Sequence, residues 1–318
     1  MRDILRRLVV GEVTEDEAVA ELRRLQLEEL GGRARLDLAR YLRRGIPEVV
    51  LASGKTPEEA ARLTVVMADH QGQGLISRMS DAHASALRDA AARAEQAVIA
   101  YHSSSARVIR RDFTPESQDG KVAILTAGTS DVPVAEEARM VVEACGLQAR
   151  VEADLGVAGL HRFLAPLASA LEWGADAIIV AAGMDGVLPG LVAGLVDAPV
   201  IGIPVSTGYG RGGAGEAALS TMLQSCSTGL TVVNIDNGVG AGAAAVLIAA
   251  RAAQGRRRGL STATTASTMA AASTRPNRAA TAPREKSAPP GNANNRPRAS
   301  ATTRIPTSSH GKPRRRRP

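Results

Sequence analysis

The sequence predicts an α/β protein in which a doubly wound parallel sheet follows a smaller, mainly helical α+β region. Short apolar runs alternate with helical stretches from Lys121 onward, the pattern of βαβ units. Glycine-rich loops follow several runs, at the strand ends where parallel sheets bind ligands. Periodicity is lost after Gly255. We therefore expect an N-terminal region at 1–118, a sheet-forming domain at 119–254 and a disordered basic tail at 255–318.

Helix-start signals mark the N-terminal region. Thr14-x-x-Glu17 and Thr56-x-x-Glu59 fit the capping box, with Pro57 at a first helical position. A charged cluster between them either contacts a phosphate or forms a solvated helix face; it comprises Arg35, Asp37, Arg40, Arg43 and Arg44. We expect two short helices within 1–30, strands at about 46–51, 74–79 and 107–111, and helices at about 57–69 and 81–96.

Five strands and five helices alternate in the second region. The strands are expected at about 121–126, 149–153, 177–182, 199–204 and 230–235. The helices are expected at about 133–145, 158–173, 188–196, 214–226 and 241–253. This regular alternation predicts a parallel sheet with helices on both faces.

Charge is divided unevenly along the chain. Residues 251–318 hold 16 of the 39 Lys and Arg residues and one of the 32 acids, Glu285, while residues 1–250 hold the other 23 bases and 31 acids. Any argument for nucleic-acid binding therefore concerns the tail alone, and the tail has no aromatic residue to stack on bases. We expect a dispensable extension, with weak binding of anionic polymers as the alternative.

The sequence shows no sign of export or membrane insertion. No uninterrupted apolar span reaches membrane length, and the first residues lack the apolar segment of a signal peptide. The two cysteines, Cys145 and Cys226, do not form a disulfide framework. We therefore expect a cytoplasmic protein with no membrane partner.

The loop after the first strand of the predicted sheet suits a nucleotide. Gly128–Asp131 combines close backbone approach, hydroxyl donors and an acceptor for a ribose hydroxyl, ahead of a helix whose first amides favour an anion. Alternatively, Ser130 or Asp131 only caps that helix. The pair His161-Arg162 either contacts a phosphate or carboxylate or serves for capping and surface packing.

Two later loops also follow predicted strands. Gly183–Gly190 places Asp185 between glycines, where it can act as a general acid or base, a partner for a cationic substrate or a magnesium ligand, unless it is a helix cap. Gly208–Gly213 matches G-x-G-x-x-G, with Asp236 lying 23 residues beyond. That fingerprint normally opens the first βαβ unit of a Rossmann domain, so a nicotinamide-type domain is only a rival interpretation.

A cysteine lies between the fourth helix and the last strand of this region. A Cys226 thiolate is a possible nucleophile, but no His, Lys or Arg lies within several residues to favour it. Spacing alone therefore favours a small buried residue. Cys145 lies on the apolar face of its helix and is expected in the core.

Taken together, four segments resemble the LarB family. They are AGTSD at 127–131, GVAGLHR at 156–162, AAGMDGVLPGLVAGLVDAPVIGIPVSTGYG at 181–210 and SCSTGLTVVNIDNGVGA at 225–241. The catalytic half of LarB is similar to the PurE-type aminoimidazole ribonucleotide carboxylases, so the resemblance implies a PurE-like three-layer sandwich. The N-terminal stretch RLDLARYLRRGIPEVVLASGKTPEEA also resembles LarB.

Departures from PurE favour LarB. The histidine of the PurE loop Ala-Ala-His-Leu-Pro is Val187 here, and Asp185 stands two residues before it. PurE also lacks a long N-terminal region. The corresponding acid in LarB is usually glutamate, so Asp185 is one methylene shorter. A PurE-type carboxylase or mutase is the enzyme alternative, and a non-catalytic nucleotide-binding or nucleic-acid-binding protein is the alternative from another class.

The resemblance implies the LarB activity, the first step of nickel-pincer nucleotide synthesis. Carbon dioxide or bicarbonate carboxylates C5 of the pyridinium ring of nicotinic acid adenine dinucleotide, and hydrolysis of the phosphoanhydride releases AMP. Cys226 would add to C4, and Asp185 would handle the proton or stabilise charge. A homo-oligomer is implied, an octamer in PurE-like domains, as is Mg²⁺ with ligands that the sequence does not identify. The implied substrate-binding residues are Gly128, Thr129, Ser130, Asp131, His161, Arg162, Gly183, Met184, Gly186 and Ser206.

Overall fold

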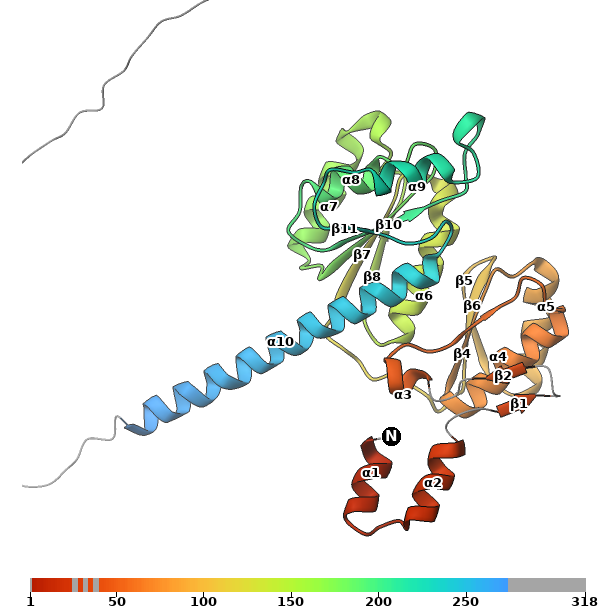
Figure 1. Ribbon diagram of the computed structural model, residues 1–318, viewed down its shortest axis with the longest axis vertical. Coiled ribbons are helices and arrows are strands. Elements are labelled where there is room, and N and C mark those ends of the chain that lie inside the picture. Colours follow the sequence, from red (N-terminus) through yellow and green to blue (C-terminus); the bar gives the residue numbers. More distant parts are fainter. Residues whose placement is uncertain (1, 25–27, 31–33, 37–39, 274–318) are drawn as a thin grey trace, which may run out of the picture. The chain divides into compact units, whose positions relative to one another are not determined.

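The computed structural model describes residues 2–24, 28–30, 34–36 and 40–273 (Figure 1). Residues 1–267 form one compact unit that contains a two-stranded hairpin, a four-stranded sheet and a five-stranded parallel sheet. The α/β class predicted from the sequence is confirmed, with an α+β region before the parallel sheet.

Two short helices begin the chain, as predicted. They are α1 (Arg2–Val9) and α2 (Glu15–Arg24). The first capping box is present, because the Glu17 amide donates to Thr14 Oγ1 at 3.2 Å and the Thr14 amide donates to the Glu17 carboxylate at 2.8 Å. The α2 helix therefore begins where the sequence signal places it.

A hairpin that the sequence analysis missed follows these helices. Strands β1 (Glu28–Leu30) and β2 (Ala34–Leu36) pair antiparallel, and the short helix α3 (Arg40–Arg44) comes next. The charged cluster proposed as a phosphate contact includes Arg35, Asp37 and Arg43, whose side chains lie outside the described residues. Its role stays a prediction.

The N-terminal sheet has the strand order β3-β4-β6-β5, and helices α4 and α5 pack beside it. Thr56 caps α4 through the Glu59 amide, with Pro57 at the first helical position as predicted. Strand β5 was not predicted; its sequence, AVIAYH, is apolar almost throughout and does not alternate with polar residues, although half of its residues are exposed. The elements are β3 (Val49–Leu51), α4 (Pro57–Gln71), β4 (Gln73–Ser77), α5 (Asp81–Arg93), β5 (Ala97–His102) and β6 (Ser105–Ile109).

All five strands predicted for the parallel sheet are present. The sheet order is β11-β10-β9-β7-β8, so the chain reverses direction across the sheet between β7 and β9. Such a switch point is the usual place for a ligand in an open α/β sheet. The strands are β7 (Lys121–Thr126), β8 (Gln148–Glu152), β9 (Ala177–Ala182), β10 (Val200–Pro204) and β11 (Leu230–Val232).

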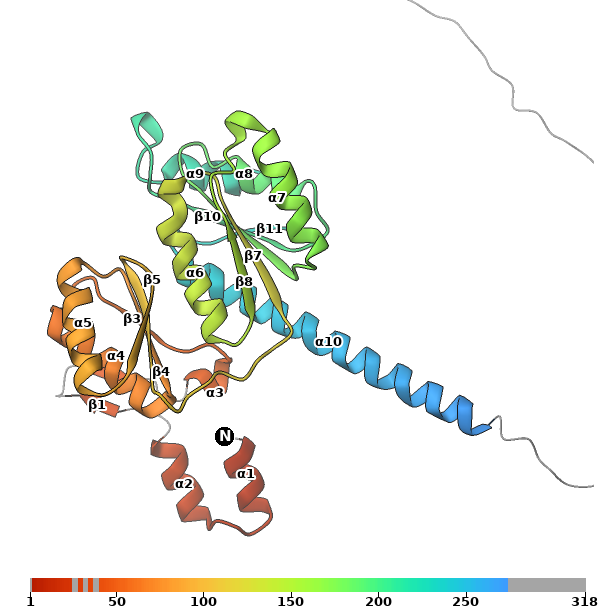
Figure 2. The same ribbon diagram turned by 180° about the vertical axis from the view of Figure 1, so that it is seen from behind.

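Helices cover both faces of the parallel sheet and make three layers (Figure 2). Val122 and Ile124 of β7 pack into one core with α6 and α10, whereas Ala123 and Leu125 face a second core with α7, α8 and α9. Successive residues of a strand point to opposite faces, which explains why this strand is apolar throughout. The helices are α6 (Val132–Ala144), α7 (His161–Glu172), α8 (Leu188–Ala193), α9 (Glu216–Leu223) and α10 (Gly238–Ser273).

The N-terminal sheet packs on α6 of the parallel domain. Leu75 and Tyr101 belong to the same core cluster as Val141. Tyr101 donates a hydrogen bond to the Glu143 carboxylate at 2.8 Å, and Gln73 Nε2 donates to the Ala144 carbonyl at 2.9 Å. Burial, together with the adjacent Glu143, raises the pKa of Tyr101 to about 12. These contacts bring the carboxyl end of β4 close to the loops of the parallel sheet.

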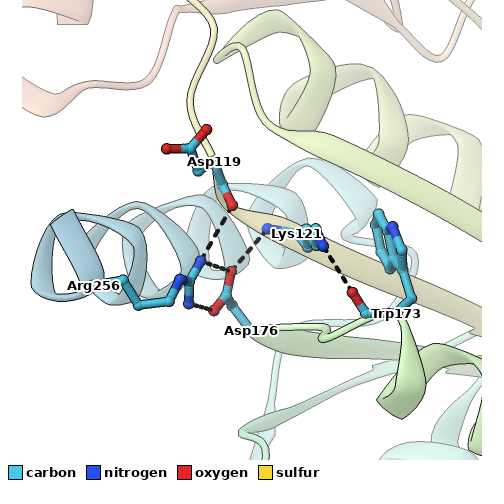
Figure 3. A network of polar contacts seen from close by, with 5 residues as sticks. All are labelled: Asp119, Lys121, Trp173, Asp176 and Arg256. Atoms are coloured by element: carbon cyan, nitrogen blue, oxygen red, sulfur yellow. Dashed lines mark hydrogen bonds and ion pairs between the residues drawn. The ribbon is translucent and has the colours of Figure 1, made fainter. Parts of the chain in front are cut away.

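The last helix ends later than the sequence predicts. We expected a helix at 241–253 and a tail from 255, but α10 continues to Ser273. Arg256 pairs with Asp176, whose side chain is 6% exposed, and donates to the Asp119 carbonyl at 3.2 Å; Asp176 also accepts from the Lys121 amide at 2.9 Å (Figure 3). This network anchors the helix just beyond its predicted end at 253. Residues 274–318 lie outside the described residues.

Neither α10 nor any other helix in the described part of the chain is long and apolar enough to cross a membrane.

Candidate active site

A cavity of about 460 Å³ opens at the carboxyl ends of four strands of the parallel sheet. Its walls are the loops that follow β7, β8, β9 and β10, so it lies at the switch point of the sheet. We call it the first cavity. It is lined by Ala127, Gly128, Ser130, Asp131, Gly156, Val157, Ala158, Gly183, Met184, Asp185, Thr207, Gly208 and Tyr209.

Asp131 ties two of these loops together. One carboxylate oxygen accepts from the Gly128 amide at 2.9 Å, and the other accepts from Thr207 Oγ1 at 2.9 Å. The residue is 3% exposed, and this burial raises the pKa of its carboxyl group. Both the predicted ribose contact and the capping alternative involve this side chain, and the structure shows it holding the walls of the first cavity in place.

The loop after β9 carries the exposed acid of the first cavity. Gly183 has no room for a side chain, since a Cβ there would lie 2.3 Å from the Thr207 carbonyl oxygen. Met184 has a φ of 52°, a left-handed conformation that non-glycine residues rarely adopt. Asp185 is exposed, and its carboxylate accepts a long 3.4 Å bond from the Val187 amide. The carboxylate is therefore accessible to a ligand in the cavity.

Several predicted site residues do not line the first cavity. Thr129 is exposed beside it. Gly186, with a φ of 64°, packs against the backbone of Ala218, so its role in the described chain is to bring α9 close. Arg162, which begins α7 together with His161, pairs with Asp154 at 3.4 Å. Substrate contacts by these residues stay predictions.

Cys226 is exposed and also lies outside the first cavity. Its loop packs on α8, the helix that follows the Asp185 loop, because Ser227 Oγ donates to the Gly190 carbonyl at 2.7 Å. The buried position that spacing favoured is therefore wrong for Cys226. Cys145 is fully buried as predicted, and burial raises its pKa to about 12.

A second cavity of about 430 Å³ adjoins the first. Ser130 and Thr207 line both, so the two share a wall. Ser206, a predicted substrate-binding residue, lines the second cavity rather than the first. The remaining wall brings together the end of β4, α6 and the segment before α10; it consists of Arg78, Met79, Ser104, Pro133, Val134, Glu137, Val205 and Asp236.

The two cavities differ in charge. Among the described residues that line the first cavity, Asp131 and Asp185 are acidic and none is basic. The second cavity has Arg78 opposite Glu137 and Asp236. Burial raises the pKa of Glu137 to about 7, the neighbouring Asp236 adds to the rise, and Arg78 opposes it. The first cavity therefore suits a cationic group, whereas Arg78 is the one positive charge among the described residues that line the second.

The rival Rossmann interpretation makes Asp236 the acid of a dinucleotide fingerprint, but its carboxylate accepts from the Ser206 amide at 2.8 Å. The Gly208–Gly213 loop follows β10, the fourth strand of the sheet in chain order, and forms a short 3₁₀ turn at Gly210–Gly212 before α9. These positions argue against the Rossmann interpretation.

The sequence analysis missed the contribution of the N-terminal region. Arg78 follows β4 and reaches the Asp236 carbonyl through Nη2 at 2.9 Å. Glu137 lies within α6, where it has the pattern of an ordinary helical residue. Of the residues in the shared wall, Thr207 could have been found from the sequence, because it directly follows a predicted strand in a glycine-rich loop.

Comparison with known families agrees with this architecture. Residues 27–111 match the LarB/PurE-like N-terminal domain, and residues 121–270 match AIR carboxylase. An uncharacterized protein of Methanocaldococcus jannaschii is 40% identical over 250 residues, which cover 78% of this chain and 96% of that protein. The chain belongs to the LarB family. Its parallel sheet is a PurE-like domain, and the two domains together indicate a carboxylase-type enzyme of the PurE-like carboxylase and mutase group.

More distant relatives match a shorter stretch of this LarB protein. The N5-carboxyaminoimidazole ribonucleotide mutase of Thermotoga maritima is 33% identical over 91 residues, or 27% of this chain and 51% of that enzyme. The enzyme of the same name from Pyrococcus abyssi is 36% identical over 91 residues, covering 27% and 50%. The similarity to mutases therefore extends to about half of each mutase.

Proposed function

We propose that this chain carboxylates C5 of the pyridinium ring of nicotinic acid adenine dinucleotide and hydrolyses the phosphoanhydride. The products are pyridinium-3,5-biscarboxylic acid mononucleotide and AMP, in the first step of nickel-pincer nucleotide synthesis. The observation that carries the proposal is the first cavity, which is acidic, has no basic residue among its described lining and presents Asp185. A cationic pyridinium ring is stabilised in such surroundings.

The lining of the first cavity also fits a flat ring in shape. Ala127, Val157 and Ala158 supply small apolar surfaces, and Met184 supplies a polarizable one. The Asp185 carboxylate is accessible there and can accept the proton that leaves C5 after carboxylation. Val187 occupies the place of the PurE loop histidine, so Asp185 is the candidate acid-base group of this loop.

Addition of the Cys226 thiolate makes the intact pyridinium ring reactive toward carbon dioxide. Addition of the thiolate to C4 converts the cationic pyridinium into a neutral dihydropyridine in which C5 is an enamine carbon. The C5 electron pair attacks carbon dioxide, C5 then loses its proton to a base, and departure of the thiolate restores the aromatic ring. This divides one difficult substitution into easier steps. Water attack on one phosphorus separately cleaves the phosphoanhydride and releases AMP.

Exposure of Cys226 supports a homo-oligomer in this mechanism. The thiol lies outside the first cavity of its own chain. Several large aliphatic side chains in or beside α7, α8 and α9 are exposed, namely Leu160, Leu164, Leu191, Leu195 and Leu223. Where exposed apolar side chains form a contiguous patch, they commonly mark an interface. We propose that association of chains, as octamers in PurE-like domains, brings Cys226 to a ring-binding cavity, and light scattering tests the association.

We propose that Mg²⁺ binds together with the phosphate groups of the substrate. Among the described residues, no group of three or more His, Cys, Asp or Glu side chains is placed to hold a metal ion. Mg²⁺ is commonly bound by one or two carboxylates plus substrate phosphates. No step of the mechanism above depends on it.

Product analysis tests the proposed function. The purified chain is incubated with nicotinic acid adenine dinucleotide, bicarbonate and Mg²⁺, and the products are separated and weighed by mass spectrometry. We expect AMP and a mononucleotide heavier by one carboxyl group. AMP with an unmodified mononucleotide would limit the chain to hydrolysis, and an unchanged dinucleotide would reject the proposal.

The similarity to N5-carboxyaminoimidazole ribonucleotide mutases supports a second candidate, a PurE-type carboxylase or mutase. Incubations with aminoimidazole ribonucleotide and bicarbonate, and with N5-carboxyaminoimidazole ribonucleotide, in place of the dinucleotide separate the two candidates. Val187 in place of the loop histidine predicts no turnover of either substrate.

A further inference from the structure

The two cavities differ in the basic side chains that could bind a phosphate group. Nicotinic acid adenine dinucleotide carries a cationic ring at one end and a diphosphate in its middle. Among the described residues that line either cavity, Arg78 alone is basic. Arg162, the base that the sequence suggested for phosphate, lines neither cavity and pairs with Asp154.

We propose that Arg78, from the N-terminal region, binds the phosphate groups of the dinucleotide in the second cavity while the pyridinium ring occupies the first. This inference rests on the proposed function. It gives the N-terminal region a direct part in substrate binding, so the substrate site is built from the four-stranded and the five-stranded sheet.

The geometry of Arg78 fits this role. Its Nη2 donates to the Asp236 carbonyl at 2.9 Å, a bond to the backbone that leaves other N–H donors of the guanidinium free to turn toward an anion. The side chain is exposed at the wall of the second cavity. Bidentate donation from a guanidinium is the geometry that phosphate oxygens prefer.

The backbone around this contact is held in an unusual conformation. Arg78 has a φ of 55° and Asp236 a φ of 54°, both left-handed for residues with side chains. The Asp236 amide is anchored by the Pro204 carbonyl at 2.9 Å, and its carboxylate by the Ser206 amide at 2.8 Å. Strained residues of this kind cluster at ligand sites, where the surrounding structure over-determines them.

The two cavities meet at a shared wall. Ser130 and Thr207 line both, and the hydroxyl of Ser130 can donate to a phosphate oxygen of a ligand that spans them. Glu137 and Asp236 line the second cavity and repel an anion when ionised, whereas Arg78 attracts it.

Equilibrium binding to the full chain tests the inference without relying on turnover. Isothermal titration calorimetry compares nicotinic acid adenine dinucleotide, nicotinic acid mononucleotide, nicotinic acid riboside and inorganic pyrophosphate. Loss of one charge-assisted contact predicts that Arg78→Ala binds the three phosphate ligands about 10- to 100-fold more weakly. Binding of the riboside, which has no phosphate, is expected to be unchanged and reports an intact fold. Arg78→Lys should recover part of the affinity.

Two control variants make the result specific. Arg62→Ala removes the same charge from a separate groove between α4 and α5 and should leave all four affinities unchanged. Arg162→Ala tests the rival position. Equal loss for all four ligands in Arg78→Ala, unchanged phosphate affinity, or a phosphate-specific loss in Arg162→Ala instead would each overturn the inference.

The outcomes separate this inference from the proposed function. If the wild-type chain binds pyrophosphate through Arg78 but neither binds nor carboxylates the dinucleotide, the phosphate site stands and the proposed function fails. If the dinucleotide is carboxylated and Arg78→Ala binds it normally, the proposed function stands and the Arg78 inference fails.

Discussion

The two adjoining cavities differ in how the chain builds them. The first is made by loops that directly follow four strands of one parallel sheet, each visible in the sequence as glycines and small polar residues after an apolar run. The second brings Arg78 and Ser104 together with Glu137 and Asp236, residues without a common motif. Functional residues at strand ends can therefore be predicted from the neighbouring sequence, whereas a site where two sheets meet cannot.

The largest expected effect comes from removing the Cys226 thiol, the nucleophile of the proposed reaction in the first cavity. Cys226→Ala removes the nucleophile, so carboxylation should fall by about 1000-fold or more while the affinity for the dinucleotide is retained. Product formation and calorimetry measure the two quantities. Cys145→Ala is the matched control, because Cys145 is fully buried; it should lower stability by about 1 kcal/mol and keep turnover. Full turnover by Cys226→Ala would eliminate the thiol mechanism.

The next effect concerns the acid of the first cavity. Asp185→Asn keeps the shape of the side chain but removes its charge and basicity, so turnover should fall by about 100-fold or more. Asp185→Glu should retain part of the activity, because the carboxylate is exposed and has space to move. Asp197→Asn, an exposed acid after α8, is the control in the same rate assay. Equal rates for Asp185→Asn and Asp197→Asn would remove Asp185 from the mechanism.

The wall shared by the cavities gives a smaller effect, on stability. Thr207→Val deletes the donor to the buried Asp131 carboxylate and should lower the free energy of unfolding by about 1–3 kcal/mol. Chemical denaturation measures the change, with the exposed Thr228→Val as the control. An unchanged midpoint in Thr207→Val would show that Asp131 does not hold the two loops together.

The second cavity predicts a pH effect through Glu137. Arg78 from the end of β4 and Asp236 before α10 face this carboxyl group, and its pKa is raised from 4.5 to about 7, chiefly by burial. Because the folded-state pKa is the higher one, the stability contribution of Glu137 is complete below pH 4.5 and is lost as the pH rises through 7.

Glu137→Gln removes this titration. The variant should therefore lose less stability than the wild type between pH 5 and pH 8, by up to roughly 3 kcal/mol for a shift of this size. Thermal unfolding across that pH range measures it. If the stability of the two proteins changed in parallel with pH, Glu137 would not be a buried carboxyl group with a raised pKa.

The smallest expected effect is that of the basic tail. Deleting residues 274–318 removes most of its positive charge but none of the described residues that line either cavity, so the rate of carboxylation should not change. A tenfold loss of activity would assign the tail a function. Loss of binding to nucleic acid without loss of carboxylation would confine that function to anionic polymers.

Much of the parallel domain could be predicted from the sequence. Its strands are buried on both faces, so they stand out as apolar runs such as Ala177–Ala182, and parallel pairing places their following loops at one edge. That reasoning correctly brought Gly128, Asp131 and Asp185 together. It did not find that α10 continues past residue 253, where Arg256 pairs with Asp176, a residue distant in sequence.

The remaining site residues show why local reasoning failed elsewhere. Nothing near Arg78 in the sequence indicates that β4 ends beside α6; that follows from the packing of Leu75 and Tyr101 with Val141. Arg162 was one candidate for a phosphate contact, with surface packing as the alternative, and it pairs with Asp154 here, a residue eight positions earlier. For Cys226 the sequence favoured a buried position because no His, Lys or Arg lies nearby, yet the thiol is exposed.

Transfer of an isotope label tests the central claim most directly. The chain is incubated with nicotinic acid adenine dinucleotide, Mg²⁺ and ¹³C-bicarbonate, and the mononucleotide product is examined by mass spectrometry and ¹³C NMR. We predict one labelled carboxyl group on C5 of the pyridinium ring, formed together with AMP. A mononucleotide without label, or label found only in aminoimidazole ribonucleotide supplied in parallel, would contradict the account.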